Sequence, residues 1–387
     1  MSRRNFLHCQ FPYRGDNVKF VIDDHYDALS IINGGGQGHI IKAYDVNKQQ
    51  IVAVKKNKES TNPDNMKRIY REFVISKIIQ HRNLITLLDA FAEKNGNDLY
   101  LVYEYMDASM FDLMHLPMTD SRNFRRMVWD SNDGDYFTAD ILFQMFCGLR
   151  YLHQDKLKFI HRDIKPDNIL LKKLGTGYWL LKICDLGLAR QLKEKEQEQV
   201  DLTNYVVTWP YRAPEVMISD SYTFAIDLWS VGCILAEMIT GELLFKREDR
   251  RDQIFRILLF TGFPEGTEFA SYIKSEINKT PELYGPSRVY EYFSDNKLPN
   301  WTKQRISKQF IRDLLKNLLE FNPSDRLTAE QGSELPHFNF LQNRIGINDI
   351  APEPYNPDVI TWPKTESGWR TLIKKELDDY EAKRFGN

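Results

Sequence analysis

His161-Arg162-Asp163-Ile164-Lys165-Pro166-Asp167-Asn168 is a polar stretch that runs directly into the apolar segment Ile169-Leu170-Leu171. Asp163 can accept or orient the proton of an attacking hydroxyl, and Lys165 can stabilise negative charge on a group in transfer. Asn168 offers a neutral oxygen to a hard cation. A solvated surface loop explains these residue types at this spacing poorly. The stretch therefore predicts a catalytic loop.

Downstream of this loop, Asp185-Leu186-Gly187 follows a second apolar segment, Leu180-Leu181-Lys182-Ile183-Cys184. An isolated Asp-Leu-Gly is only a turn. After Asn168 and an apolar segment, however, Asp185 becomes a candidate for a second ligand of the same cation.

Upstream, Asn33-Gly34-Gly35-Gly36-Gln37-Gly38-His39-Ile40 lies between two candidate strands. Glycines allow the backbone to approach phosphates closely, because no side chain fills that space. A simple tight turn explains the glycines equally well. No helix follows them directly, which argues against a dinucleotide-binding fold.

Val52-Ala53-Val54-Lys55 ends another candidate strand with a lysine. Such a lysine usually points into solvent. Here Glu72 follows on a predicted helix, where its carboxylate can pair with the Lys55 ammonium and hold it toward a nucleotide phosphate.

The composition excludes some classes of protein. The 387 residues carry a net charge of −2, so no overall charge favours nucleic-acid binding, and 42% hydrophobic residues allow a sizeable core. An uninterrupted apolar run of about 18 residues, which a membrane span requires, is absent from the sequence. The four cysteines have no metal-ligand spacing, which indicates reduced thiols.

The hydrophobic pattern predicts a small antiparallel sheet with one helix, followed by a larger helical region. The expected strands are 28–32, 39–44, 51–56 and 99–105, and the expected helices are 64–80, 139–153, 227–240, 312–320 and an amphipathic one at 369–377. Helix 227–240 is apolar almost all round, which is typical of a helix buried at the centre of a lobe. The expected divisions are an arm at 1–25, a small lobe at 26–105, a large lobe at 106–340 and an extension at 341–387 that packs back.

These motifs, in this order, resemble those of the eukaryotic protein kinases over about residues 26–340. The resemblance implies a bilobal α+β fold, ATP and Mg²⁺. It implies catalytic roles for Asp163, Lys165, Lys55 and Glu72, and metal binding by Asn168 and Asp185. It places Tyr103 at the back of the adenine pocket. The implied nucleotide-binding residues are Asn33, Gly35, Gly38, Ile40, Ala53, Lys55, Glu104, Met106 and Leu170.

Thr203-Asn204-Tyr205 resembles the Thr-x-Tyr activation lip of mitogen-activated protein (MAP) kinases. Tyr70-Arg71-Glu72, Met106-Asp107-Ala108-Ser109, the Trp369–Leu377 segment and an insert near 246–300 are most similar to the c-Jun N-terminal kinase (JNK) branch. The resemblance implies that Thr203 and Tyr205 are phosphorylated. It assigns Arg71, Arg162 and Arg190 to the first phosphate and Arg212 to the second, and it pairs Glu215 with Arg326.

The resemblance implies that the protein is a serine/threonine kinase of a stress signalling cascade and that it is located in the cytoplasm and nucleus. The implied partners are an upstream dual-specificity MAP kinase kinase, protein substrates including transcription factors, phosphatases and docking-motif peptides, with no nucleic acid and no membrane. Two alternatives stay open: a cyclin-dependent-type kinase that needs a protein activator, and a kinase-fold scaffold with little activity.

Several residues depart from the kinase pattern. Asn33 replaces the first glycine of the phosphate loop, and Leu186 replaces the usual phenylalanine after the metal-binding aspartate. Ser76 occupies a helix position that is generally apolar. Leu186 and Ser76 both predict looser packing of the active form, and low basal activity is therefore expected. Trp209 replaces the first of two arginines that meet the phosphotyrosine, and Pro210 replaces an aromatic residue. The stretch at 107–140 is longer than in the family.

Overall fold

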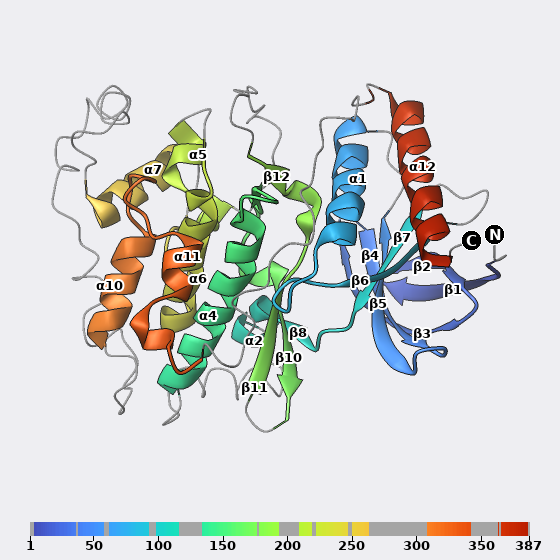
Figure 1. Ribbon diagram of the computed structural model, residues 1–387, viewed down its shortest axis with the longest axis horizontal. Coiled ribbons are helices and arrows are strands. Elements are labelled where there is room, and N and C mark those ends of the chain that lie inside the picture. Colours follow the sequence, from blue (N-terminus) through green and yellow to red (C-terminus); the bar gives the residue numbers. More distant parts are fainter. Residues whose placement is uncertain are drawn as a thin grey trace. The chain divides into compact units, whose positions relative to one another are not determined.

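The computed structural model of the chain describes residues 4–35, 38–57, 62–92, 98–115, 134–175, 178–192, 209–218, 222–246, 250–262, 308–341, 363 and 365–385. The chain divides into two compact units. The first unit contains Met1–Asp107, Asp185–Leu188 and Pro352–Asn387, and the second contains Ala108–Cys184 and Ala189–Ala351. A sheet with one covering helix pair in the first unit and a mainly helical second unit confirm the predicted α+β, bilobal class (Figure 1).

The first unit is built on a five-stranded antiparallel sheet of order β3-β4-β5-β7-β6. Its strands are β3 (Tyr26–Gly35), β4 (Gly38–Asp45), β5 (Gln50–Asn57), β6 (Leu87–Ala92) and β7 (Leu99–Glu104). The four predicted strands are confirmed, each extended by one to three residues at one or both ends or ending one residue early. Strand β6 was not predicted, and it forms the edge beside β7.

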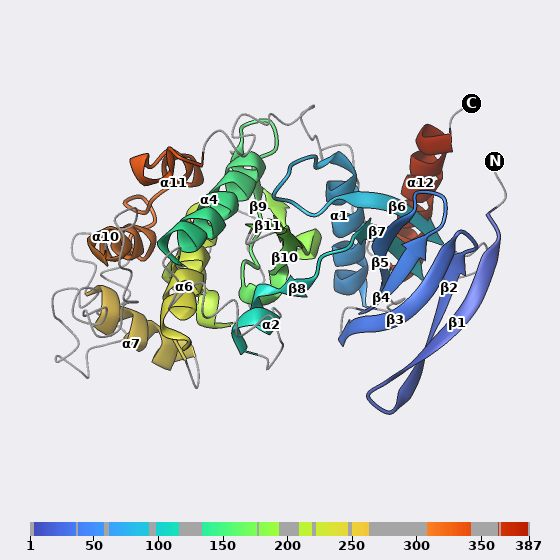
Figure 2. The same cartoon turned by 90° about the horizontal axis from the view of Figure 1, so that it is seen from below.

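The N-terminal residues form a hairpin of β1 (Phe6–Tyr13) and β2 (Asp16–Asp23), where the sequence predicted only an arm. Arg14 and Gly15 both have positive φ at the two-residue turn, 50° and 90°, which suits the right-handed twist of the strands. Phe20 and Ile22 of β2 are buried in one cluster with Phe91 and Tyr100 of the sheet. Figure 2 shows the hairpin beside β3, so these residues extend the core of the first unit.

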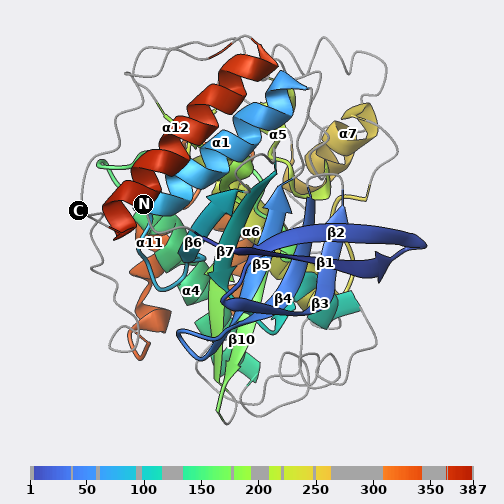
Figure 3. The ribbon, with the colours of Figure 1, turned by 90° about the vertical axis from the view of Figure 1, so that its right-hand side faces the viewer.

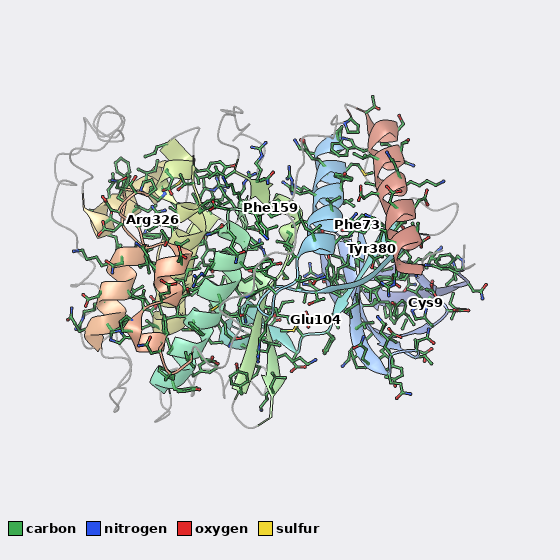
Figure 4. The ribbon with its side chains drawn as sticks, in the orientation of Figure 1. Cys9, Phe73, Glu104, Phe159, Arg326 and Tyr380 are labelled. Carbon is green, nitrogen blue, oxygen red and sulfur yellow. The ribbon has the colours of Figure 1, made fainter. Side chains whose placement is uncertain are left out.

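Helix α1 (Pro63–Ile78) begins at Asn62, whose side chain accepts a hydrogen bond from the backbone N–H of Asp64. Helix α12 (Glu366–Phe385) lies along α1, as Figures 1 and 3 both show. The rings of Phe73 and Tyr380 meet with centroids 5.7 Å apart (Figure 4). The predicted amphipathic C-terminal helix is therefore present and docked on the first unit.

The second unit is organised around α6 (Ala225–Thr240), whose residues from Ile226 to Ile239 are all buried. This confirms the prediction of a central helix. The α-helices of the described residues that accompany it are α2 (Met110–His115), α4 (Gly134–His153), α5 (Pro214–Ile218), α7 (Arg250–Thr261), α10 (Lys308–Leu318) and α11 (Ala329–Ser333). Gly241 ends α6 in the left-handed conformation at φ 74°, where a side chain would be strained.

Short strands frame the polar loop of the second unit. β9 (Phe159–Ile160) pairs with β12 (Arg190–Gln191), and β10 (Ile169–Leu174) pairs with both β11 (Tyr178–Ile183) and β8 (Ala108–Ser109). Gln144 of α4 donates to the Trp179 carbonyl and accepts from the Leu181 N–H, which ties β11 to the helix. The loop 161–168 is thus held between β9 and β10. Four 3₁₀ turns complete the described elements: η1 (Pro166–Asn168), η2 (Leu186–Leu188), η4 (Trp209–Tyr211) and η6 (Pro336–Phe338).

All four cysteines carry free thiols. Within the described ranges, every helix is too short or too polar to cross a membrane.

Candidate active site

The first unit contains a part-buried ion pair between β5 and α1. Lys55 Nζ lies 2.6 Å from Glu72 Oε1, and both side chains are largely shielded from solvent. Lys55 comes from the strand and Glu72 from the helix, so the pair fixes α1 against the sheet. The contact predicted from the sequence is therefore present. Burial raises the pKa of the Glu72 carboxyl, and the positive charge of Lys55 opposes that rise.

Asp185 belongs to the same unit. Its Oδ1 lies 4.0 Å from Lys55 Nζ and accepts a hydrogen bond of 3.4 Å from the Gly187 N–H. Its φ of 64° is unusual for a residue with a side chain, and such strain is concentrated at functional sites. Arg71 of α1 donates to the Gly187 carbonyl at 3.3 Å, which anchors the Asp-Leu-Gly turn to the helix that carries Glu72.

In the second unit, the polar loop gathers three of its predicted residues. Asp163 Oδ2 accepts hydrogen bonds from Lys165 Nζ at 2.7 Å and from Asn168 Nδ2 at 2.9 Å. Asn168 Nδ2 also donates to the Asp163 backbone carbonyl at 2.8 Å. The carboxylate of Asp163 is thus held in one orientation, beside a cation that can balance negative charge.

Asp227, which was not among the predicted site residues, supports this loop. Arg162 has a left-handed φ of 72°, and its backbone N–H donates to Asp227 Oδ1 at 2.9 Å. The N–H of His161 donates to the other oxygen of Asp227 at 2.8 Å. Burial alone would raise the pKa of Asp227, but the hydrogen bond from His153 and its charge lower it below the usual value. The sequence signal was a lone acid at the start of the apolar helix α6.

His161 adds a second support. The ring is fully buried; Nδ1 accepts from the Asp163 N–H at 3.3 Å, so Nε2 carries the proton and donates to the Cys184 carbonyl at 2.9 Å. This imidazole links the loop to the end of β11.

The glycine-rich hairpin occupies the turn from β3 to β4. Asn33 is opposite Ile40, and Gly35 is opposite Gly38. A Cβ on Gly38 would lie 2.2 Å from the Lys56 carbonyl oxygen, and its φ of 149° is rare for other residues. The hydroxyl of Tyr13, at the end of β1, donates to the Gly34 carbonyl at 2.9 Å. The hairpin that the sequence did not predict therefore steadies one side of this glycine turn.

The residues assigned to adenine lie on both units. In the first unit, Ala53 is opposite Tyr103 in the sheet, the Glu104 N–H donates to the Thr86 carbonyl at 3.3 Å, and Met106 is buried. In the second unit, Leu170 of β10 is half-buried and opposite Ser109 of β8.

The arginines assigned to the phosphates already have protein contacts. Arg71 binds the Gly187 carbonyl, Arg162 lies 5.4 Å from the Tyr222 ring, and Arg212 lies 4.0 Å from the Trp209 ring. Arg190 is in β12, opposite Ile160. Thr203 and Tyr205 lie outside the described residues, as do 116–133 of the long stretch and most of the predicted insert near 246–300.

Glu215 and Arg326 form the predicted pair. The two terminal nitrogens of Arg326, Nη1 and Nη2, donate to the Glu215 carboxylate at 2.7 and 3.1 Å, and both side chains are almost fully buried (Figure 4 labels Arg326). A bidentate pair of this kind fixes the start of α5 against the segment after α10.

The oxygen donors suit a hard divalent cation. The two hydrogen bonds of Asn168 Nδ2 leave the amide oxygen as the group that can bind a metal. Asp185 supplies a partly exposed carboxylate. Neutral and charged oxygens are the ligands that Mg²⁺ prefers, so the residues fit such an ion.

Comparison with known proteins gives a consistent result. The chain matches the protein kinase domain family over residues 26–338. It is 33% identical to the stress-activated protein kinase JNK of Drosophila melanogaster, over 98% of each chain. It is 32% identical to the stress-activated protein kinase jnk-1 of Caenorhabditis elegans, over 94% of this chain and 74% of that protein. It is 31% identical to the stress-activated protein kinase JNK of Suberites domuncula, over 95% and 97%.

Proposed function

This chain belongs to the protein kinase family, alongside the JNK stress-activated kinases, and from that membership we propose that it acts as a MAP kinase switched on by phosphorylation of Thr203 and Tyr205. As a protein serine/threonine kinase it uses ATP and a divalent metal. The proposal adds Mg²⁺ as that metal, an upstream dual-specificity kinase, and protein substrates in a stress cascade.

The observation that carries the proposal is the part-buried pair of Lys55 and Glu72 at 2.6 Å. Lysine side chains are seldom shielded from solvent unless they are paired, and here the partner carboxylate belongs to another element, α1. Lys55 would bind the α- and β-phosphates of ATP. When α1 moves, Glu72 moves with it, so the orientation of the ammonium depends on α1.

The reaction transfers the γ-phosphoryl group to a serine or threonine hydroxyl. Asp163 accepts the hydroxyl proton as the oxygen–phosphorus bond forms, and the bond from the γ-phosphorus to the β–γ bridging oxygen breaks, releasing ADP. Lys165, 2.7 Å from Asp163, stabilises the charge on the transferred group. Asn168 and Asp185 would hold the metal, which supplies charge neutralisation at the phosphates when bound.

The proposed activation by phosphorylation rests on the charge of the phosphate. A phosphate on Thr203 carries nearly two negative charges and needs arginines around it. Arg71 is one of the assigned arginines, and it lies on α1 next to Glu72. Drawing Arg71 toward a phosphate would therefore adjust the helix that positions Lys55.

The test is a phosphoryl-transfer assay with the full chain, phosphorylated on Thr203 and Tyr205, against the same protein carrying Asp185→Asn. Transfer of labelled phosphate to serine and threonine of a protein substrate by the first protein alone is the expected result. Equal transfer of labelled phosphate by the two proteins would show that the transfer does not depend on Asp185 and would reject the proposed reaction. If neither transfers phosphate but Mg²⁺–ATP still raises the melting temperature, the scaffold alternative is favoured.

A further inference from the structure

One oxygen of Glu72 receives two hydrogen bonds. Lys55 Nζ donates to Oε1 at 2.6 Å, and the hydroxyl of Tyr103 donates to the same atom at 3.2 Å. Ser76 Oγ lies 3.3 Å from the Tyr103 hydroxyl. Four side chains from β5, β7 and α1 therefore form one connected series of polar contacts.

The register of the sheet explains why these groups meet. Tyr103 is opposite Ala53, and Leu101 is opposite Lys55. Residues two apart on a strand share a face, so Tyr103 and Lys55 project from the same side of the sheet. On α1, Ser76 follows Glu72 by one helical turn, which places both on the same side of the helix.

The donors and acceptors can be assigned. An ionised carboxylate only accepts, so the single proton of the Tyr103 hydroxyl points to Glu72, and Ser76 must then donate to the tyrosine oxygen. Burial and the charge of Glu72 raise the pKa of Tyr103 well above its usual value, so this hydroxyl stays protonated. Ser76 and Tyr103 are only 3% and 7% exposed, so water does not readily replace either partner.

We infer that Tyr103 and Ser76 are positioning residues, which hold the Glu72 carboxylate in place for Lys55 and so align the ammonium for the nucleotide. This inference rests on the proposed function of Lys55. The Lys55 ammonium has a competing anion, because Asp185 Oδ1 lies 4.0 Å away. A carboxylate fixed by a second donor keeps Lys55 on Glu72, whereas a carboxylate that rotates would leave it free to move toward Asp185.

This contact explains why a polar residue, Ser76, can occupy this position of α1. The sequence suggested that serine there loosens the packing, because related kinases carry an apolar residue. In the structure its hydroxyl completes the contacts of Tyr103, so a polar link stands where an apolar contact was expected.

Tyr100 provides a matched control on the same strand. It is 1% exposed, and its hydroxyl accepts a hydrogen bond from the Val21 N–H at 3.0 Å. Its odd spacing from Tyr103 puts it on the opposite face of β7. Tyr100→Phe removes a buried hydroxyl of the same kind without touching Glu72.

The experiment compares the phosphorylated full chain with Tyr103→Phe, Glu72→Leu, the double variant and Tyr100→Phe, using Mg²⁺–ATP and myelin basic protein. We expect Tyr103→Phe to lower kcat/KM for ATP by roughly 3- to 10-fold and to leave KM for the protein substrate unchanged. In the Glu72→Leu background, which has no acceptor for the Tyr103 hydroxyl, the same substitution should have almost no further effect, because it acts through Glu72. Ser76→Ala should give a smaller loss in the same direction.

Two results would overturn the inference: a Tyr103→Phe enzyme equal to wild type, or a loss of the same size with and without Glu72. A loss in Tyr100→Phe as large as in Tyr103→Phe would point to general packing instead. Urea unfolding of the wild type, the Tyr103 variant, the Glu72 variant and their double variant separates this inference from the proposed function. If the changes in urea midpoint caused by the Tyr103 and Glu72 substitutions are not additive but the wild type is inactive, the proposed function is rejected and the contact between the two residues is kept. If the changes are additive, the contact itself is rejected.

Discussion

The guanidinium of Arg212 lies 4.0 Å from the centre of the Trp209 ring. The Trp209 carbonyl is held as well, since it accepts from the Arg212 N–H at 3.0 Å and from the Gln253 side chain at 2.8 Å. Trp209 stands where related kinases carry an arginine for the phosphotyrosine. Here the Arg212 guanidinium and the Trp209 ring stack on each other, a contact worth about 0.5–2 kcal/mol.

We therefore expect the two phosphosites to differ in weight. Thr203→Ala should remove most of the activation, whereas Tyr205→Phe should reduce it only about 2- to 5-fold, because Arg212 gains little from a second partner. Trp209→Arg should increase the dependence on Tyr205. Kinase activity, measured at a phosphorylation level verified by mass spectrometry, gives the comparison. Equal losses for Thr203→Ala and Tyr205→Phe would contradict this prediction.

Asp163→Asn should abolish most of the catalysis without unfolding the loop. An amide cannot accept the substrate proton, so kcat should fall about 10²- to 10⁴-fold. Asp167→Asn is the matched control, because Asp167 is exposed in the same loop. Its kcat and the melting temperatures of both variants should stay close to wild type. A normal kcat for Asp163→Asn would remove this residue from the reaction.

Asp227 should make the second unit sensitive to acid. Its pKa in the folded protein is below the usual 3.8, so its contribution to stability is present above pH 3.8 and is lost as the pH falls through the folded value. At neutral pH, Asp227→Asn should cost about 3–5 kcal/mol, because the N–H groups of His161 and Arg162 and the ring of His153 lose a buried charge.

The free energy of unfolding of wild type and Asp227→Asn, measured by urea titration at several pH values, checks this sign. The difference between the two proteins should shrink below pH 3.8. A difference that grows on acidification would show that Asp227 is not the stabilising anion.

Trp369 should affect activity from outside the reacting groups. Its ring is 2% exposed, with its centroid 5.9 Å from that of Tyr70 on α1. Trp369→Ala should destabilise the first unit by about 3–5 kcal/mol and lower kcat, because α1 also carries Glu72. The exposed Asp378 of α12 is the control, and Asp378→Ala should change neither quantity. Unfolding and kinase assays at 20 °C and 37 °C would measure both, and a Trp369→Ala protein with normal stability would refute the docking role.

The predictable part of the fold followed from local patterns. The strands around Lys55 could be predicted because apolar residues alternate with polar ones along them. Helix α6 could be predicted because it is apolar almost all round, which is typical of a buried helix. The β1–β2 hairpin was not predicted, since its apolar residues find partners such as Phe91 and Tyr100 only in the folded sheet. Strand β6 was also missed. Its pairing with β7 is irregular, because the register shifts between Leu87 and Asp89.

The site shows the same division. The contact of Lys55 with Glu72 was predictable because both residues belong to motifs at characteristic positions. The contact of Tyr103 with Glu72 depends on the register of β5 with β7 and on the rotation of α1, and neither is visible in a single sequence. Asp227 was visible only as an isolated acid in an apolar segment, and its two bonds to the loop required the folded chain.

Helix α12 also sets an order of events during synthesis. The ribosome completes α1 and the five-stranded sheet at residue 104 and reaches the start of α12 at residue 366 roughly 260 residues later, which takes about 13–52 seconds at 5–20 residues per second. Throughout that interval Tyr70 and Phe73 lack the aromatic partners that α12 brings. The nascent chain therefore exposes the aromatic face of α1 to chaperones, and a chain that terminates before α12 keeps this face exposed.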